Sequence, residues 1–288
     1  MKKTNAIEAI KTSKGTKATK AIVTLAIGAQ YKELWDKLCR PSWQSYAVRH
    51  GYDLICIDTP LDLSERAMKR SPAWQKCLIL SQDFSKDYER IVWIDSDIII
   101  NASAAPSIVE SVPEDMAGAI NVWASPTPGW FDTALKRLMD MNPNIGTFGT
   151  TPAEYYEKYG LPAEFDAVVQ TGVLVLSHRH REILEHTYYA YEEKGGPEWH
   201  YEMRPLSYEF LRADCVQWID NRFNMSWPVY KCLFYPFLLN SPEAPAAGGQ
   251  GREALIKVCV NATLSNGYFL HFPGSKFPDM SLVDSATP

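Results

Sequence analysis

The sequence YERIVWIDSDIII at residues 88–100 places two carboxylates, one residue apart, between two apolar runs. An uninterrupted Ile/Val/Trp run predicts a strand near the centre of a sheet, with both of its faces covered. Burying an unpaired carboxylate is very costly, so a positive partner is expected at Asp95 and Asp97. Oxygen ligands suit Mg²⁺ or Mn²⁺, so a divalent cation that carries a phosphorylated substrate is the obvious candidate.

The composition narrows the class of protein. The chain has 288 residues, 46% of them hydrophobic and 22% charged, which fits one large α/β domain or two small ones. A net charge of −5 argues against a nucleic-acid partner, since binders of nucleic acid are usually basic. The six cysteines are scattered singly without a CxxC pair, which is typical of reduced thiols in a cytoplasmic protein.

Membrane association is expected to be peripheral at most. No apolar run approaches the roughly 20 residues that span a bilayer. Residues 1–19 carry lysines throughout without the long apolar core of a signal peptide. We therefore expect a mobile basic N-terminal arm, followed by the folded domain.

The folded part begins with a βαβ pattern. A β-rich apolar strand is predicted over residues 21–27, a helix follows through Tyr31 and Tyr46, and a second strand is predicted over residues 52–58. Pro41 predicts a break or kink in the helix. The two strands should pair in parallel, which places the loop after the first strand at the carboxyl edge of the sheet, where open α/β folds bind ligands.

Later segments extend this α/β pattern. Ser71 and Pro72 predict the start of a helix by a serine cap and a first-turn proline. Strands are predicted at residues 116–122 and 166–177, and Gly172 inside the second indicates a bulge or a close approach to the backbone. Residues 124–162, interrupted by Pro and Gly, are either an acceptor-binding region or a surface excursion without function.

Four segments in order resemble the GT-A-fold glycosyltransferases, specifically the retaining glycogenin and bacterial lipopolysaccharide galactosyltransferase type. They are residues 22–26 followed by Tyr31, Asp95-Ser96-Asp97, Asp166 with Gln170-Thr171-Gly172-Val173-Leu174-Val175, and His271-Phe272-Pro273-Gly274-Ser275-Lys276. The resemblance covers residues 20–277 and implies a single GT-A (Rossmann-like) α/β domain over residues 20–288. Its sheet would be mixed and mostly parallel, flanked by helices, with a nucleotide-binding part at about 20–123 and an acceptor part at about 124–288.

The resemblance also implies a set of site residues. Asp95, Asp97 and His271 would bind Mn²⁺ or Mg²⁺, while Gln170 and Glu202 would be catalytic residues near the sugar. The nucleotide-sugar donor would be bound by Thr24, Leu25, Ala26 and Tyr31 at the uridine, Asp95 or Ser96 near the ribose, Lys76 near the phosphate or sugar, and Gly274 and Lys276 at the diphosphate.

Two positions depart from the family pattern. Relatives carry Asn where this chain has Gln170, and an Asp-Gln pair where this chain has Glu202-Met203. Met203 lacks the amide that lies near the anomeric carbon in some relatives. Glu202 is therefore the carboxylate expected to face the sugar, with Glu209 as the alternative if the helix is shifted by one or two turns.

The expected function is metal-dependent transfer of a hexose or pentose from a UDP-sugar to a hydroxyl of a saccharide or glycoconjugate, with retention implied by the resemblance. Two alternatives stay open. A non-catalytic nucleotide-sugar-binding protein would keep the fold without turnover, and a nucleotidyltransferase would need a Gly- and Lys-rich triphosphate loop that residues 27–30 do not provide. His178, His180 and His186 lie beside arginines in a helical context, so we expect a solvated face there rather than a second metal site.

Overall fold

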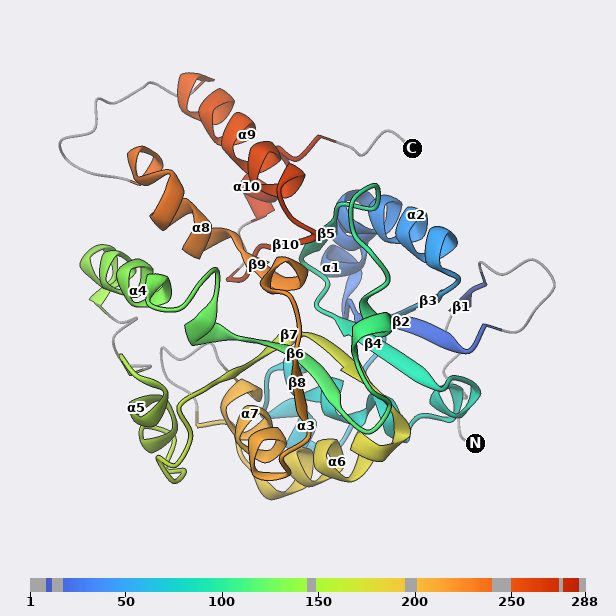
Figure 1. The fold of residues 1–288 in the computed structure, drawn as a ribbon. Coiled ribbons are helices and arrows are strands. Elements are labelled where there is room, and N and C mark those ends of the chain that lie inside the picture. Colours follow the sequence, from blue (N-terminus) through green and yellow to red (C-terminus); the bar gives the residue numbers. More distant parts are fainter. Residues whose placement is uncertain are drawn as a thin grey trace.

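The computed structural model describes residues 9–11, 18–143, 149–194, 201–239, 250–274 and 277–284. A mixed sheet with helices on both faces forms the centre of the molecule (Figure 1). In the described residues its strand order is β1-β3-β2-β4-β7-β6-β8. The strands are β1 (Ala9–Ile10), β2 (Lys20–Leu25), β3 (Asp53–Ile57), β4 (Arg90–Ile94), β6 (Ala117–Asn121), β7 (Val169–Leu176) and β8 (Val216–Trp218).

The predicted βαβ unit is confirmed. β2 and β3 pair in parallel, with Val23 opposite Ile55. The connecting helix has three parts: α1 (Ala29–Leu34), a π-helical turn (Trp35–Cys39) and α2 (Arg40–His50). Pro41 lies in the first turn of α2, where its missing N–H costs least. The helix does not break at this proline, because it continues from Ala29 to His50; the irregularity is the π-helical turn that precedes Pro41.

β4 is the central strand that its apolar run predicted. Ile91, Val92, Trp93 and Ile94 are all buried. The strand pairs in parallel with β2 and antiparallel with β7, and β7 pairs antiparallel with β6. The expected α/β fold with a mixed, helix-flanked sheet is confirmed.

A second, smaller sheet adjoins the end of β4. Within the described residues it contains β5 (Ile98–Ile100), β10 (Phe269–His271) and β9 (Met225–Ser226), in the order β5-β10-β9. β10 runs antiparallel to β5 and parallel to β9. This sheet brings the segment after Asp97 beside residues near the other end of the chain.

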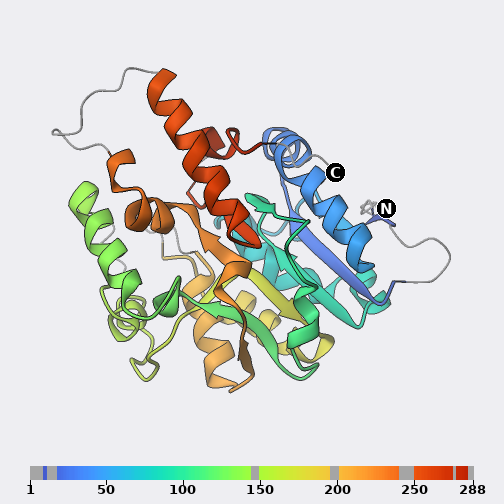
Figure 2. The same ribbon diagram turned by 45° about the horizontal axis from the view of Figure 1, so that its top comes forward.

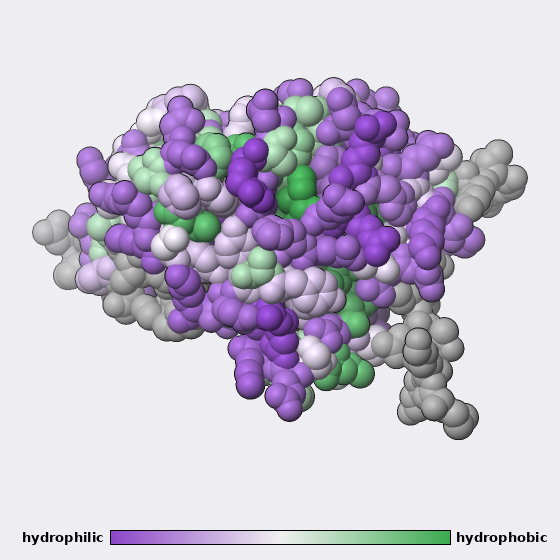
Figure 3. All heavy atoms as spheres, turned by 90° about the horizontal axis from the view of Figure 1, so that it is seen from below, coloured by the Kyte–Doolittle hydropathy of each residue, from purple (hydrophilic) through white to green (hydrophobic). Residues whose placement is uncertain are grey.

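Two apolar layers hold the helices on the main sheet. One face is covered by the 3₁₀ helix Pro72–Ser81, α6 (Arg181–Ala190) and α7 (Met203–Arg212), which bury Trp74, Leu184 and Phe210. The other face packs against α2 and α9 (Gln250–Ser265), with Trp43 and Val260 in the same core. The outer side of the first layer, seen from below in Figure 3, is mostly hydrophilic.

The 3₁₀ helix Pro72–Ser81 begins as predicted, because the Ser71 hydroxyl accepts a hydrogen bond from the Ala73 N–H.

The remaining helices lie at the periphery. α4 and α8 pack against each other and lie side by side in Figure 2. The peripheral helices are α3 (Glu65–Met68), α4 (Trp130–Met141), α5 (Pro152–Glu157), α8 (Trp227–Phe234) and α10 (Phe277–Met280).

The N-terminal arm differs in part from the expectation. Ala9 and Ile10 form β1, antiparallel to β3, so this part of the arm belongs to the sheet. Both residues are uncharged, and the open edge of β3 offers them backbone hydrogen-bond partners. Residues 1–8 and 12–17 lie outside the described part. No helix in the described residues is both long enough and apolar enough to cross a bilayer.

Candidate active site

The two sheets fix the positions of the acidic residues. Asp95 follows β4 directly, and its N–H donates to the Gly172 carbonyl at 2.8 Å, which extends the β4–β7 ladder by one residue. The carbonyl of Asp97 accepts from the Phe272 N–H at 3.0 Å. β5 begins at the residue after Asp97 and pairs with β10 at His271. Asp95 thus belongs to the main sheet, and Asp97 and His271 to the small one.

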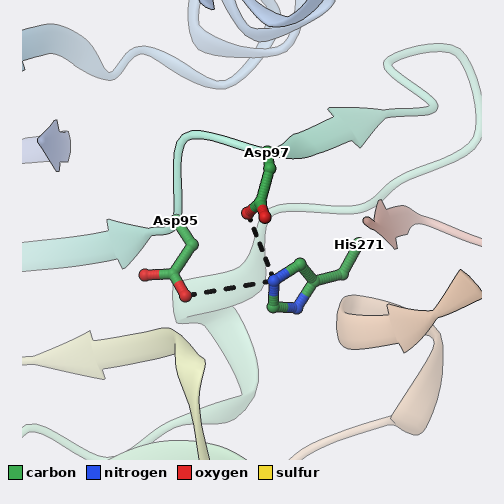
Figure 4. A group of neighbouring side chains, drawn as sticks. All are labelled: Asp95, Asp97 and His271. Atoms are coloured by element: carbon green, nitrogen blue, oxygen red, sulfur yellow. Dashed lines mark ion pairs between the residues drawn. The ribbon is translucent and has the colours of Figure 1, made fainter. Parts of the chain in front are cut away.

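The three predicted metal ligands lie together (Figure 4). His271 Nε2 is 3.2 Å from Asp97 Oδ1 and 3.9 Å from Asp95 Oδ2. One ligand atom from each residue lies within 4.8 Å of the other two. The carboxylates are partly exposed and the imidazole is buried, so the cluster is open on the carboxylate side. Two carboxylate oxygens and an imidazole nitrogen fit a divalent cation such as Mn²⁺ or Mg²⁺.

Charge interactions shift the pKa values of these groups. Burial acts to raise the pKa of Asp95, but Lys76 and His271 outweigh it, so the pKa lies below its ordinary value. Burial acts to lower the pKa of His271, but Asp97 and Asp95 outweigh it, so this pKa is raised. The cluster without a cation therefore favours an ionised Asp95 and attracts a proton to His271.

Lys76 is a buried cation at the centre of the site. Its Nζ lies 2.9 Å from Asp95 Oδ1 and 2.8 Å from Glu202 Oε1, and it donates to the Thr171 carbonyl at 3.2 Å. Its side chain is 4% exposed. Burial acts to lower the pKa of Lys76, but Asp95 and Glu202 together raise it above its ordinary value. Lys76 therefore stays charged beside Asp95 and the candidate metal site.

Glu202 pairs with Lys76 and is almost fully buried. Its Oε1 also accepts a hydrogen bond from the Thr171 hydroxyl at 3.1 Å. Burial raises the pKa of Glu202, and Asp95 adds to this effect while Lys76 opposes it. Tyr201, the preceding residue, has φ 36°, which is unusual for a side-chain-bearing residue and is a kind of strain that gathers at active sites.

Glu209, the alternative carboxylate, is not brought to the site. It accepts hydrogen bonds from Tyr191 and Arg212 and lies 3.6 Å from His186. These contacts place it between α6 and α7. Glu202 is the N-cap residue of α7, which begins at Met203, and Glu209 lies two turns along that helix.

Gln170 is linked to His271 through Asn224. Its Oε1 accepts from the Gly172 N–H and from Asn224 Nδ2, the latter at 2.9 Å. Asn224 Oδ1 in turn lies 2.9 Å from His271 Nδ1. The side-chain carbonyl of Gln170 is thus directed toward Asn224, which contacts His271, rather than toward open space.

Gly172 shows the close approach that its place in the strand predicted. A Cβ at this position would lie 2.6 Å from His271 Cε1 and 2.9 Å from Gln170 Oε1. Any side chain here would displace the imidazole. A glycine at residue 172 therefore lets the ring of His271 rest against the backbone of β7.

The predicted uridine-binding residues lie at the same sheet edge as Asp95, because β2 is the parallel neighbour of β4. Thr24 is fully buried, and its Oγ1 has no hydrogen-bond partner within the described residues. Leu25 is partly buried, and the Ala26 N–H donates to the Ile57 carbonyl at 2.8 Å. Tyr31 is 48% exposed, with its ring edge-on to Phe277 at 6.1 Å.

The remaining predicted residues flank the cluster. Ser96 lies between the two aspartates, and its carbonyl accepts from Cys39 Sγ at 3.1 Å. Gly274 has φ 73°, and a Cβ there would meet none of the described residues within 4 Å, so its backbone is open on the side that they define. Lys276 lies outside the described residues.

Several site residues were not found by sequence reasoning. Trp93 Nε1 donates to Asp95 Oδ1 at 2.7 Å, Thr171 contacts both Lys76 and Glu202, and Asn224 supports His271. Thr171 lies between Gln170 and Gly172, and Trp93 lies two residues before Asp95, which was the available signal. Asn224 had no such signal, because its contact with His271 depends on the pairing of β9 with β10.

The histidine expectation was wrong for one residue. His180 is buried, with its ring 6.1 Å from that of Phe210, whereas His178 and His186 are exposed. The turn that begins at Ser177 folds His180 under α6, which its spacing from the arginines did not reveal. All six cysteines are free thiols, as expected.

No protein-family model matches the sequence, and no curated protein matches it either. Among solved structures, the chain is similar to a glycosyltransferase involved in the glycosylation of the major capsid of PBCV-1. That match has a TM-score of 0.51 at 15% identity and covers 91% of this chain and 100% of the other. The likeness shows that the chain has the fold of this glycosyltransferase.

Two further similar structures are more distant. The apo structure of the bifunctional glycosyltransferase WbbM matches with a TM-score of 0.48 at 11% identity, covering 93% of this chain and 50% of that one. The galactosyltransferase LgtC in complex with donor and acceptor sugar analogs matches with a TM-score of 0.45 at 13% identity, covering 88% of this chain and 87% of that one.

Proposed function

We propose that this protein is a metal-dependent glycosyltransferase that moves a sugar from a UDP-sugar to a hydroxyl of a saccharide or glycoconjugate. The observation that carries the proposal is the convergence of Asp95, Asp97 and His271 beside buried Lys76. A glycosyltransferase fold supports it. This combination suits a substrate whose leaving group is a diphosphate, because both a cation and a lysine counter negative charge there.

The nucleotide half of the donor would lie along the carboxyl end of β2. Thr24 has a buried hydroxyl without a partner in the described residues, as expected of a group that meets a ligand. Leu25 and Ala26 continue this edge, and the exposed ring of Tyr31 offers a face to the uracil. Ser96, placed between the metal-binding aspartates, would lie near the ribose.

The diphosphate would lie over the metal cluster. A bound cation supplies Lewis-acid stabilisation of the leaving diphosphate. Asp95, Asp97 and His271 would hold the cation, and Gly274, with its open backbone, would let a phosphate approach closely. The resemblance places Lys276 at the diphosphate too, which stays a prediction.

Lys76 and Glu202 form the part of the site nearest to the expected sugar. When the bond between the anomeric carbon and the diphosphate breaks, both electrons go to the diphosphate, and Lys76 stabilises the charge that develops. Glu202 holds Lys76 at 2.8 Å. Carboxylate and amide oxygens support an oxocarbenium-like state, so Glu202 and Gln170 remain our candidates for contact with the sugar. Retention of configuration rests on the family resemblance.

The acceptor would bind to residues 124–288, and the nucleotide to residues 20–123. Within the acceptor part, α4 and α8 pack together and present half-exposed aromatic rings, Trp130 and Phe234, with centroids 5.4 Å apart. Aromatic faces of this kind commonly line sugar sites. The acceptor hydroxyl would form the new bond to the anomeric carbon, and its proton would pass to an oxygen of the departing diphosphate.

Mn²⁺-dependent hydrolysis of a panel of UDP-sugars tests the proposal without knowledge of the acceptor. Asp97→Ala and His271→Ala should each abolish hydrolysis, whereas Asp83→Ala, which changes an exposed acid paired with Lys86, should not. Full activity in either site variant would show that the metal site is wrong. Binding of UDP with Mn²⁺, but no sugar release from any donor, would favour the non-catalytic alternative.

A further inference from the structure

A chain of side-chain amides leads from the backbone of β7 to the imidazole of His271. Gln170 accepts from the Gly172 N–H, Asn224 lies between Gln170 and His271, and both contacts of Asn224 are 2.9 Å long. Asn224 and His271 are 1% and 3% exposed. The chain is therefore shielded from water over the part that contacts the imidazole.

The backbone sets the direction of every hydrogen bond in this chain. The Gly172 N–H can only donate, so the Gln170 atom that faces it must be the carbonyl oxygen Oε1. The Asn224 atom that meets the same oxygen must then be the donor Nδ2, which leaves Asn224 Oδ1 facing the ring. Because Oδ1 can only accept, the hydrogen in that contact belongs to His271 Nδ1.

The opposite nitrogen of the ring faces the carboxylates. With Nδ1 carrying the hydrogen, neutral His271 has a free lone pair on Nε2, which lies 3.2 Å from Asp97 Oδ1 and 3.9 Å from Asp95 Oδ2. A metal ion needs this lone pair, and ligating histidines usually donate their other N–H to a fixed acceptor. Here the acceptor is an amide that is itself held by a second amide.

We propose that Asn224 and Gln170 are positioning residues that fix the tautomer and orientation of His271, so that Nε2 is presented to the cation. Gln170 therefore acts on the metal site through Asn224, in addition to any contact of its amide nitrogen with the sugar. The inference rests on the proposed metal-dependent function, but it concerns the imidazole and is measurable without substrate.

Gln170→Leu and Gln170→Glu form a matched pair for the test. Leucine cannot accept from Gly172 or Asn224, so Asn224 loses the contact that sets its orientation. Glutamate keeps an oxygen that can accept from both Gly172 and Asn224, so it should preserve these hydrogen bonds. Asn224→Ala removes the acceptor of Nδ1 directly. Asn101→Ala, which removes an amide that donates to the Leu264 and Gly267 carbonyls, is the control for a lost structural amide outside the chain.

Two measurements that need no turnover report whether the hydrogen bonds from Gly172 through Gln170 and Asn224 to His271 are intact. Nitrogen NMR of the metal-free protein with labelled histidine, recorded at a pH where the ring is neutral, reports the tautomer of His271; His271→Gln identifies its signals. Calorimetric titration with Mn²⁺ alone reports metal affinity. We expect the Nδ1–H tautomer in the wild type and in Gln170→Glu. Gln170→Leu and Asn224→Ala should show mixed tautomers and bind Mn²⁺ at least about 10-fold more weakly, the effect typical of lost support for a metal ligand.

The outcomes separate this inference from the proposed function. If Gln170→Leu keeps the wild-type tautomer and binds Mn²⁺ within twofold of wild type, or if Gln170→Glu is impaired as much as Gln170→Leu, the positioning role is wrong and the metal site stands. A residue that acts only on the sugar would give that first result. A wild-type protein that binds no Mn²⁺ would overturn both. Asn224→Ala is interpreted only if it folds. If it does not fold, Gln170→Leu, at a less buried position, gives the answer.

Discussion

Gly172 and His271 are in direct contact, because the imidazole ring lies where a side chain at residue 172 would be. Gly172→Ala would bring a Cβ within 2.6 Å of His271 Cε1 and move the ring away from the carboxylates. We expect Mn²⁺ affinity to fall at least about 10-fold, together with a loss of about 1–3 kcal/mol of stability from overpacking. Calorimetry with Mn²⁺ and urea unfolding measure the two effects.

Gly118→Ala is the matched control for this substitution. A Cβ at residue 118 would lie 2.6 Å from Val112 Cγ2, so it overpacks the sheet to a similar degree. Its stability should fall comparably while its Mn²⁺ affinity stays within twofold of wild type. Equal losses of affinity in the two variants would mean that general destabilisation, not displacement of His271, weakens the site.

Lys76→Met tests the buried ion pair. Removing the lysine leaves Glu202 buried without its cation, and breaking a buried pair from one side costs about 3–5 kcal/mol. Adding Glu202→Gln should restore much of this loss, because the second charge is then absent too. Urea unfolding of the single and double variants measures the coupling.

The control for Lys76→Met is an exposed pair. Lys86 and Asp83 are 67% and 97% exposed, so Lys86→Met should change the free energy of unfolding by less than about 1 kcal/mol. Similar effects of Lys76→Met and Lys86→Met would contradict the buried character of the Lys76–Glu202 pair.

Thr24→Val should have opposite effects on stability and on ligand binding. The variant removes a buried hydroxyl that has no partner in the described residues, so the free protein should gain about 1 kcal/mol. If this hydroxyl meets the nucleotide, UDP affinity should fall by about fivefold, the equivalent of one hydrogen bond. Thermal shift with and without UDP reports both quantities.

Thr187→Val separates these effects from the loss of any buried hydroxyl. The Thr187 hydroxyl donates to the Ile183 carbonyl at 2.9 Å, so its removal should destabilise the protein and leave UDP affinity unchanged. A Thr24→Val variant that behaves like Thr187→Val would contradict an unsatisfied hydroxyl at Thr24.

His180 predicts a loss of stability in mild acid. Burial lowers its pKa, and the Ser177 N–H donates to its Nδ1 at 3.0 Å, so the neutral ring is the folded form. Because the unfolded chain takes up the proton first, stability is complete above the ordinary histidine pKa and falls as the pH drops below it. The slope contributed by this residue is at most about 1.4 kcal/mol for each pH unit.

The measurement is urea unfolding at pH 7.5 and 5.5, with His180→Asn as the comparison. The variant should lose less stability between the two pH values than the wild type does. His271, whose pKa is raised, acts in the opposite direction, but it is common to both proteins and cancels in the difference. Equal losses would show that His180 does not titrate differently in the folded and unfolded chains.

Local signals in the sequence predicted much of the fold of residues 20–123. The βαβ unit and the Ser71 cap depend on residues close together along the chain, so pattern and side-chain chemistry suffice to find them. The proximity of Asp95 and Asp97 to His271 was found because the family resemblance linked distant segments. Their roles in metal binding, like those of the other site residues, stay predictions.

The parts that were missed depend on long-range pairing. Neither the small sheet nor the contact of Asn224 with His271 has a local signature, since β5, β9 and β10 come from three separate parts of the chain. Similarly, no pattern indicated that Glu202 would be buried against Lys76, because charge and a position beside a helix usually favour solvent. Side chains that meet only after the sheets assemble are therefore the least accessible to sequence reasoning.

The small sheet also determines when the proposed metal site is complete. Asp97 and His271 are more than 170 residues apart along the chain and meet only where β5 pairs with β10. A nascent chain that has not yet added β10 lacks His271, so tight metal binding would report that both ends of the domain have assembled. A cation held by the three residues would cross-link the main sheet, through Asp95, to the small sheet, through Asp97 and His271.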